Sequence, residues 1–364
     1  MSRSFLSVVS VASVLLSSAS ACTCSPFSGN EGSCCTVGDT CSHWGSSPLT
    51  CTGANSVCCN SDFSSNCCPS GSGCTQGCRN SFLGPCDCLP LRPSSYDESS
   101  ALYSLRFVAA SQCEPEKGLN ETWSCDACPA STPLREVTVV QEKGHQCLVG
   151  FDGEKFVVAF RGSLSFEDWM ADLKSATMEE FTLRPDCVGC EVGSGWFSAY
   201  SSLRSGVYSA LYSLASAHPS SGLIITGHSL GAAMASLFLA DLEVSDPPLF
   251  KGVQLPVYTF GEPRVGNEHY ASWFEDRFPS SWYRVVHHDD PVPHLPPPLL
   301  GFRHGPTEVW YAESGTGFGF YEVCDGEDGE DQQCSAGTTL SAEITDHLTY
   351  MDHGICGCED SGFR

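Results

Sequence analysis

The chain has 364 residues, enough for one large and one small domain, and its formal net charge is −25. The charge arises because only 18 lysines and arginines stand against 43 aspartates and glutamates. This balance argues against nucleic acid and against anionic membrane surfaces as partners, and it leaves neutral lipids and uncharged esters open.

The first 21 residues are typical of a secretory signal peptide. Arg3 precedes an apolar run from Val8 to Leu16, and the small residues Ala19-Ser20-Ala21 follow it. The run is too short to cross a bilayer, and no later stretch reaches the roughly 20 apolar residues that a transmembrane helix needs. We therefore expect a secreted protein with a signal peptide at residues 1–21 and no transmembrane segment.

The 24 cysteines all follow the expected cleavage site. Fourteen lie between Cys22 and Cys88 and ten between Cys113 and Cys358, so each block could pair within itself. In a secreted chain, even numbers of this kind predict disulfides rather than metal ligands. The spacing does not give their connectivity.

Residues 22–88 form a cysteine-rich segment with almost no aliphatic periodicity, so disulfides must hold it together. Its adjacent pairs Cys34-Cys35, Cys58-Cys59 and Cys67-Cys68 resemble those of a granulin-type module. Two interpretations stay open: a module that binds an unknown surface or protein, or an inert, protease-resistant cap, which we favour. The proline-containing residues 89–98 are predicted to be a linker.

From residue 99 onward the sequence alternates between strand-like and helix-like patterns, which predicts a mainly parallel sheet with helices on both faces. The predicted strands are 136–141, 146–151, 155–160, one starting at residue 222, 256–260 and 282–287, with a hairpin at 301–313. The predicted helices are 99–112, a short one beginning at 163, 197–214, one from the turn at 229 to about 241, and one ending near 278. We expect a disulfide-pinned loop at Cys125–Cys128. Cys187 and Cys190 are expected to form a structural disulfide rather than a redox pair.

The turn after the strand that begins at Gly222 carries the sequence Gly227-His228-Ser229-Leu230-Gly231. In a strand-to-helix turn of the form G-x-S-x-G, the serine hydroxyl is pushed out at the end of the sheet, and the glycines let strand and helix approach closely. The helix N-terminus offers backbone N–H groups beside that hydroxyl, where a developing oxyanion would lie. The pattern predicts a nucleophilic serine at position 229.

A serine needs a base to remove its proton, and the best base is a histidine held by a buried carboxylate. In the Ser–acid–His order of α/β-hydrolases the acid follows the end of a strand, and both Asp289 and Asp290 follow the strand that ends at His287. Only His347 and His353 come late enough to be the base, and His347 lies in the more ordered-looking segment. This reasoning leaves the choice between Asp289 and Asp290 open.

From about Ser99 to Cys358 the chain resembles the fungal-type class 3 lipases. The matching segments, in that family's order, are Phe160–Ser163, Asp168–Leu173, Gly227–Gly231, Tyr258–Asn267, Arg284–Pro296 and Asp346–Tyr350. The resemblance implies an α/β-hydrolase fold with a mainly parallel central sheet for residues 99–364, preceded by the small disulfide-rich module.

The same resemblance implies roles for individual residues. Ser229 would be the nucleophile, Asp290 the orienting acid and His347 the base, because in the family the acid precedes a residue followed by Val-Pro. Ser163 and Leu230 would form the oxyanion hole. The helix beginning at Ser163 matches the family's mobile lid, with the apolar side chains Leu164, Phe166, Trp169 and Met170.

These expectations describe a secreted serine hydrolase that acts on acylglycerols at a lipid interface. Phospholipase or feruloyl-type esterase activity stays open, and so does a catalytically silent binding protein that works through the cysteine-rich module.

The chemistry requires no metal or organic cofactor. The histidines and aspartates of 287–294 could suggest a metal site, but two prolines break the spacing that such sites favour. Asn120 begins an N-glycosylation sequon. The sequence does not predict the oligomeric state.

Overall fold

The computed structural model describes residues 96–163, 173–278, 281–305, 307–312, 321–324, 329–338 and 344–355, and the backbone of seven short strands between 34 and 90. The chain divides into two compact units, Met1–Pro93 and Ser94–Arg364. The signal peptide expected at residues 1–21 lies outside the described residues, and the granulin-type pattern of 22–88 and the linker at 89–98 stay predictions. Among the described residues, no helix is both long and apolar enough to span a membrane.

The first unit contains short antiparallel pairings. Strand β4 (Ser56–Asn60) lies between β1 (Cys34–Cys35) and β5 (Ser65–Cys68). Two further pairs join β2 to β3 and β6 to β7; their bounds are Thr40–Cys41, Leu49–Thr50, Ser72–Cys74 and Cys88–Pro90.

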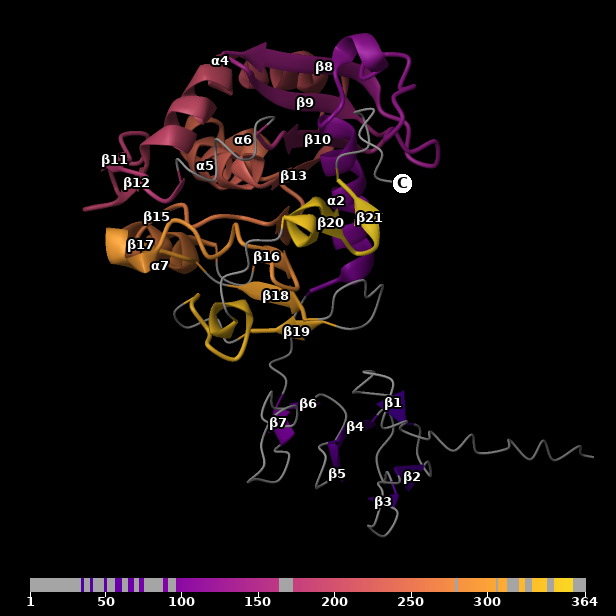
Figure 1. Ribbon diagram of the computed structural model, residues 1–364. Helices are drawn as coiled ribbons and strands as arrows, with labels where there is room; N and C mark the ends of the chain where they lie inside the picture. The colour runs from indigo at the N-terminus through magenta and orange to yellow at the C-terminus, as the bar shows by residue number, and fades with distance from the viewer. Residues whose placement is uncertain are drawn as a thin grey trace, which may run out of the picture. The chain divides into compact units, whose positions relative to one another are not determined.

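The second unit is built on a central sheet whose strands run in the order β19-β18-β16-β14-β13-β10-β9-β8 (Figure 1). In that order their bounds are Glu322–Val323, Glu308–Tyr311, Trp282–His287, Val257–Phe260, Gly222–His228, Lys155–Phe160, His145–Phe151 and Arg135–Glu142. The strands from β10 to β18 are parallel, whereas β8, β9 and β19 are antiparallel to their neighbours. This confirms the predicted α/β-hydrolase fold.

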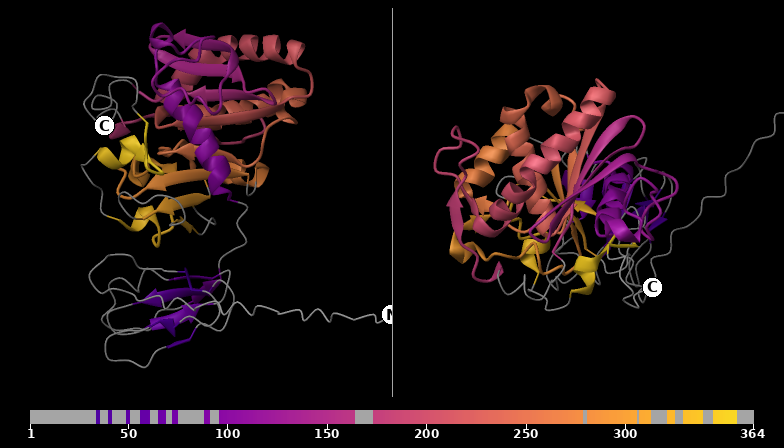
Figure 2. Two further views of the ribbon diagram at one scale, coloured as in Figure 1. Left: turned by 90° about the vertical axis from the view of Figure 1, so that its right-hand side faces the viewer. Right: turned by 90° about the horizontal axis from the view of Figure 1, so that it is seen from above.

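Helices cover both faces of this sheet (Figure 2). Helix α2 (Glu98–Ser111) lies on one face, and α4 (Ser194–Ala217) and α5 (Leu230–Ser245) lie on the other. Successive strand residues point to opposite faces, so Val158 and Ile225 are buried with α4 and α5 while Val157 and Ile224 are buried with α2. Apolar residues on both faces explain why these strands read as nearly continuous apolar runs.

The remaining elements are short. A second sheet has the order β11-β12-β15-β17, with bounds Met178–Glu180, Glu191–Gly193, Gly266–Asn267 and Phe302–Arg303. The other helices are α6 (Pro247–Phe250), α7 (Glu268–Arg277) and the 3-10 turns η1 (Pro115–Lys117), η2 (Pro298–Leu300), η3 (Ser335–Gly337) and η4 (Thr345–Leu348). A small hairpin of β20 (Thr349–Tyr350) and β21 (His353–Gly354) follows η4.

The hairpin predicted at residues 301–313 is wrong. Strand β17 pairs with β15 in the second sheet, whereas β18 pairs in parallel with β16 in the central sheet. All four residues of β18 are buried, as expected for a strand inside a sheet rather than for the arm of a surface hairpin. The segment between the two strands contains His304, which is buried and whose Nε2 donates to the carbonyl of Pro293 at 2.7 Å.

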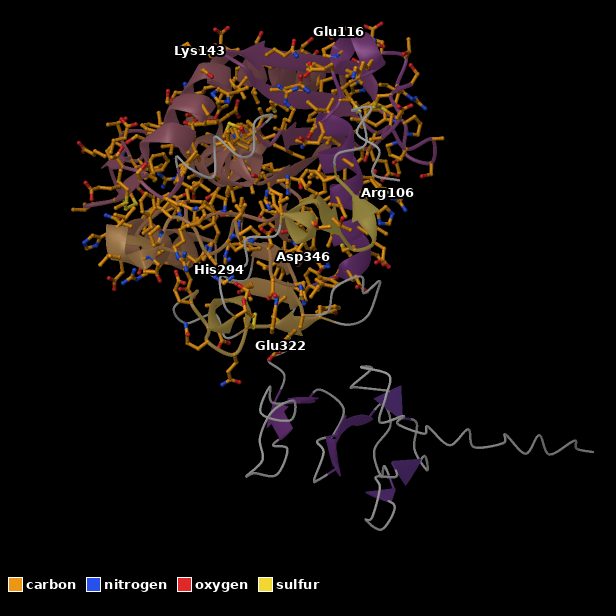
Figure 3. All side chains as sticks on the ribbon, in the orientation of Figure 1. Arg106, Glu116, Lys143, His294, Glu322 and Asp346 are labelled. Carbon is orange, nitrogen blue, oxygen red and sulfur yellow. A yellow bond between two sulfur atoms is a disulfide. The ribbon has the colours of Figure 1, made fainter. Side chains whose placement is uncertain are left out.

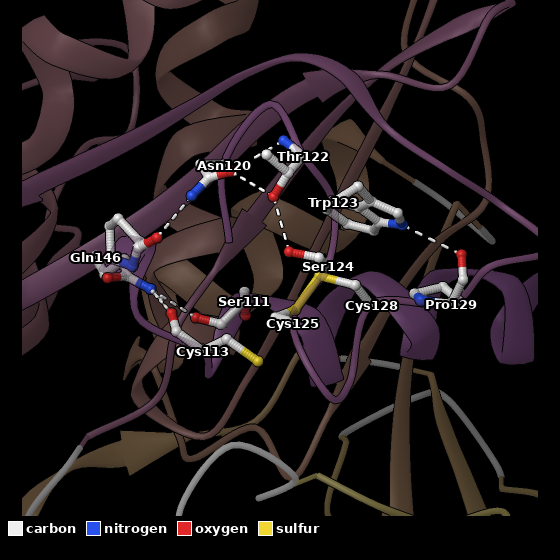
Figure 4. The surroundings of a disulfide bond; sticks show 11 residues. Ser111, Cys113, Asn120, Thr122, Trp123, Ser124, Cys125, Cys128, Pro129 and Gln146 are labelled. Atoms are coloured by element: carbon white, nitrogen blue, oxygen red, sulfur yellow. Dashed lines mark hydrogen bonds between the residues drawn. A yellow bond between two sulfur atoms is a disulfide. The ribbon is translucent and has the colours of Figure 1, made fainter. Parts of the chain in front are cut away.

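Disulfides hold several loops of the second unit. The predicted loop is confirmed by the Cys125–Cys128 bond, and beside it the Trp123 indole donates to the carbonyl of Pro129 at 3.1 Å (Figure 4). The predicted Cys187–Cys190 bond is also confirmed, and Cys324 pairs with Cys334.

Cys147 corrects the expectation that the cysteines are all paired. It is a free thiol on β9 and is completely buried. A small, weakly polar side chain suits such a position without a partner.

Glu262, which follows β14, is a buried acid. Its Oε2 accepts hydrogen bonds from Thr259 Oγ1 at 2.5 Å and from Trp282 Nε1 at 3.0 Å. Burial raises the pKa of Glu262 to about 7, and these hydrogen bonds together with the charge of Arg284 offset the effect only in part. The folded protein therefore holds this proton to a higher pH than the unfolded chain does.

We expect the substitution Glu262→Gln to make stability less dependent on pH. Between pH 4.5 and about 7 the unfolded chain has lost the Glu262 proton while the folded chain keeps it, so stability from this group falls as the pH rises through that window. At about 1.4 kcal/mol for each pH unit, the loss is on the order of 3 kcal/mol. Urea unfolding at pH 5 and pH 8 measures it, with Glu154→Gln at an exposed site as the control. Equal pH dependence in wild type and Glu262→Gln would contradict the prediction.

Candidate active site

Ser229 lies at the turn between β13 and α5 with φ +60° and ψ −128°. This backbone conformation is strained for any residue other than glycine. The strain costs on the order of 1–3 kcal/mol, which the surrounding packing must offset. A Cβ on Gly227 would lie 2.2 Å from the carbonyl oxygen of Gly231, and one on Gly231 would lie 2.1 Å from that of Phe160. Both positions therefore require glycine. The Ser229 hydroxyl is buried and has no hydrogen-bond partner among the described residues.

Asp290 follows β16 and is completely buried. One oxygen accepts from Val292 N at 2.8 Å, the other accepts from the Tyr350 hydroxyl, and His347 Nδ1 lies 2.9 and 2.8 Å from the two oxygens. Burial raises the pKa of the Asp290 carboxyl, but the charge of His347 and the hydrogen bonds from its neighbours outweigh this effect and hold the pKa below its usual value. Asp290 is therefore an ionised carboxylate directed at His347.

Asp289 and His353, the alternatives that the sequence left open, have other partners. Asp289 is half-buried, its Oδ2 lies 3.9 Å from His288 Nδ1, and its backbone N–H points to Asp346 Oδ2 at 3.4 Å. His353 is exposed on β21, where its Nδ1 donates to the carbonyl of Met351 at 2.6 Å. The structure thus brings Asp290 and His347 together and leaves the other two apart.

His347 lies on η4 and is completely buried. The His228 ring packs on the His347 ring with centroids 4.2 Å apart, and His228 Nε2 donates to the His347 carbonyl at 2.9 Å. Burial lowers the pKa of His228 well below its usual value, so this neighbour stays neutral. Gly261, at φ +56°, closes the other side: a Cβ there would lie 2.8 Å from His347 Cε1 and 2.9 Å from Asp290 Oδ2.

The loop after β10 passes close to Ser229. A Cβ on Gly162 would lie 3.3 Å from the Ser229 Cβ and 3.2 Å from the His228 carbonyl oxygen. The next residue in the chain is Ser163. On the other side, Leu230 follows Ser229 and is the first residue of α5, so its N–H has no carbonyl partner within the helix. The roles of Ser163 and Leu230 in an oxyanion hole stay predictions.

The predicted lid residues and the predicted glycosylation site remain untested. Leu164, Phe166, Trp169 and Met170 lie outside the described residues, so the lid stays a prediction. Asn120 is half-buried and its Nδ2 donates to the carbonyl of Pro115 at 2.8 Å; its glycosylation also stays a prediction.

Two of the histidines considered as metal ligands, His287 and His288, form hydrogen bonds to Asp346. His287 Nδ1 donates to the Asp346 carbonyl at 3.0 Å, and His288 Nδ1 donates to Asp346 Oδ2 at 2.8 Å. Among the described residues, one group of potential metal-binding side chains comes together: Glu308, Cys324 and Cys334. Its two cysteines form a disulfide, so that group lacks free thiols for a metal.

Tyr350 and Gly261 are site residues that the sequence reasoning did not assign. Each reaches the site through a contact between segments far apart in the chain, and each lies inside a motif used for the resemblance, the only signal that could have pointed to it. Tyr350 is completely buried, and its ring packs edge-on against Phe260 with centroids 5.8 Å apart.

Comparison with known protein families, sequences and structures finds similarity to lipases each time. The family described as "Lipase (class 3)" matches residues 157–300. A secreted mono- and diacylglycerol lipase 1 from Fusarium solani is 28% identical over 273 residues, 71% of this chain and 77% of that protein. A lipase from Rhizomucor miehei is 30% identical over 241 residues. The matched region covers 65% of this chain and 64% of that lipase. A solved triacylglycerol lipase, whose catalytic centre is described as a serine protease triad, has a TM-score of 0.61 and 27% identity, covering 73% of this chain and 98% of that one.

We expect Asp290→Asn to slow the labelling of Ser229 by a fluorophosphonate about 10⁴-fold, because the amide favours the wrong histidine tautomer. Asp289→Asn should change the rate only a few-fold, since Asp289 does not contact His347. Time courses of labelling, with thermal unfolding as a folding control, measure both. The reverse order of effects would make Asp289 the acid.

Tyr350→Phe tests the hydroxyl on Asp290 while keeping the ring. A hydrogen bond to a charged group is worth about 1.5–3 kcal/mol, so we expect labelling to slow by about 10- to 100-fold. The hydroxyl also lowers the pKa of Asp290, so its loss should raise that pKa and move the acid side of the labelling profile to higher pH. Tyr311→Phe, which removes a buried hydroxyl outside the site, is the control and should leave the profile unchanged.

Proposed function

Because the chain belongs to the class 3 lipase family and is a carboxylic ester hydrolase, we propose that it cleaves acylglycerols with Ser229, Asp290 and His347 as its triad. The observation that carries this proposal is the buried pair of His347 Nδ1 and Asp290 Oδ2 at 2.8 Å. The His347 ring packs on His228, which immediately precedes a serine of strained backbone at the start of a helix. A structural histidine would not require an ionised, buried carboxylate on its Nδ1.

In this mechanism the His347 Nε2 removes the proton from Ser229 Oγ as that oxygen attacks the ester carbonyl. Asp290 holds the Nδ1–H tautomer and stabilises the imidazolium that forms. The backbone N–H of Leu230 and the backbone N–H and hydroxyl of Ser163 donate to the oxyanion of the tetrahedral intermediate. His347 then protonates the leaving alcohol, and a water activated in the same way hydrolyses the acyl-enzyme. These steps use side chains, backbone N–H groups and water.

The substrate class rests on the relatives and on the predicted lid. The Fusarium protein is named a secreted mono- and diacylglycerol lipase, and the solved neighbour is a triacylglycerol lipase. An apolar lid at 164–170 suits long acyl chains at a lipid interface better than soluble aromatic esters. Secretion agrees with the name of the relative and with the three disulfides at Cys125–Cys128, Cys187–Cys190 and Cys324–Cys334.

The cysteine-rich segment 22–88 has no part in this chemistry, because the triad and both oxyanion donors lie beyond residue 160. We assign to it either the binding of a surface or protein partner or a protective role. Neither changes the proposed reaction.

The test is a hydrolysis panel of a triglyceride emulsion, a monoacylglycerol, phospholipid vesicles, a feruloyl ester and a soluble p-nitrophenyl ester, with wild type and Ser229→Ala. We expect the acylglycerols to be the best substrates and Ser229→Ala to lose about 10⁶ in kcat on every active substrate. Preference for phospholipid or for the feruloyl ester would replace the substrate class. Hydrolysis that survives in Ser229→Ala would remove the serine from the mechanism.

A further inference from the structure

The base His347 stands on a segment with little regular structure of its own. Turn η4 has four residues, and the β20–β21 hairpin that follows has two residues in each strand. Such short elements do not by themselves fix a side chain to within an ångström. The contacts that hold η4 against the rest of the unit therefore decide where the imidazole lies.

Apart from His347 itself, the residue just before it makes several of these contacts. Asp346 Oδ2 accepts from His288 Nδ1 at 2.8 Å, and the backbone N–H of Asp289 points to the same oxygen at 3.4 Å. The carbonyl of Asp346 accepts from His287 Nδ1 at 3.0 Å. Figure 3 labels Asp346, which lies beside β20 on the segment leading into that strand.

Two acid–histidine contacts thus join the same two segments. The loop after β16 supplies His288 and Asp290, and η4 supplies Asp346 and His347. In the Asp290–His347 contact the loop supplies the acid and η4 the histidine, and in the His288–Asp346 contact the loop supplies the histidine and η4 the acid. The Asp290–His347 contact is fully buried, whereas the side chains of His288 and Asp346 are 31% and 14% exposed.

We propose that His288 and Asp346 are positioning residues that set the register of η4 on the β16 loop, so that His347 faces Ser229 with its other nitrogen on Asp290. Neither residue touches the substrate. The inference rests on the proposed function, since it assigns His347 as the base. Partly exposed ion pairs add little to stability, so the pair acts on the geometry of the base more than on folding.

The experiment compares His288→Ala, Asp346→Ala, the double variant and His288→Asn by kcat and KM on a soluble p-nitrophenyl ester, with thermal unfolding of each. A displaced base slows the chemical step without changing substrate binding, so we expect kcat to fall about tenfold in each alanine variant with KM unchanged. The double variant should lose no more activity than the worse single variant, because each single variant already removes the shared His288–Asp346 contact. His288→Asn places an amide N–H near the position of Nδ1 and should recover most of the loss.

A matched control is available on the same domain. His218 Nε2 lies 2.6 Å from Glu136 Oε1, and the His218 side chain is 30% exposed, close to the value for His288. His218→Ala removes a histidine–carboxylate pair of similar exposure far along the chain from the site and should leave kcat unchanged. If His288→Ala does not fold, Asp346→Asn, which keeps the size of the side chain, replaces it and should give a smaller fall in kcat at the same KM.

Several results would overturn the proposal: an unchanged kcat in the alanine variants, additive losses in the double variant, or no recovery in His288→Asn. A loss of kcat that is matched by His218→Ala would also overturn it. An inactive wild type, or full activity in Ser229→Ala, would instead refute the proposed function, so the two failures are distinguishable.

Discussion

The contact between Asp290 and His347 places the most severe constraint on the structure. A carboxylate with no exposed surface is unfavourable unless every lone pair is satisfied, and here four donor contacts surround it. The donors come from two segments about sixty residues apart, the loop after β16 and the η4–β20 region. The end of β16, the conformation of Gly261 and the packing of Tyr350 must all be correct before this charge can be buried.

The serine turn imposes a second constraint, which is steric. Gly227, Gly231 and Gly162 each lie where a Cβ would approach a neighbouring backbone or side chain, at 2.2, 2.1 and 3.2 Å. These contacts bring β10, β13 and α5 together around Ser229. Asp290 follows β16, a strand of the same parallel sheet that β14 separates from β13, whereas His347 comes from η4, outside that sheet. The carboxyl ends of parallel strands meet at one edge of a sheet, and the contact of His347 with Asp290 holds η4 at that edge.

Much of this arrangement could be predicted from the sequence. The apolar run before Ser229, the glycines around it and the order of the downstream acid and histidine are local signals with a local physical cause. The choice of Asp290 over Asp289 came from a family resemblance, because both residues follow the same strand. Tyr350 and His288 could not be placed, since their partners are distant in sequence. The hairpin at 301–313 failed for a related reason: two short strands that are adjacent in the chain belong to different sheets.

Cys147 gives this protein an internal probe of its own core. The thiol is completely buried on β9, and burial raises its pKa well above the usual value, so the folded protein presents almost no thiolate to reagents. Its side chain points to the face of the sheet that α4 and α5 cover, so the sulfur becomes accessible only when that packing opens. The rate at which Cys147 reacts with a thiol reagent therefore reports the opening of the core between the sheet and these helices, independently of the loops that carry Asp290 and His347.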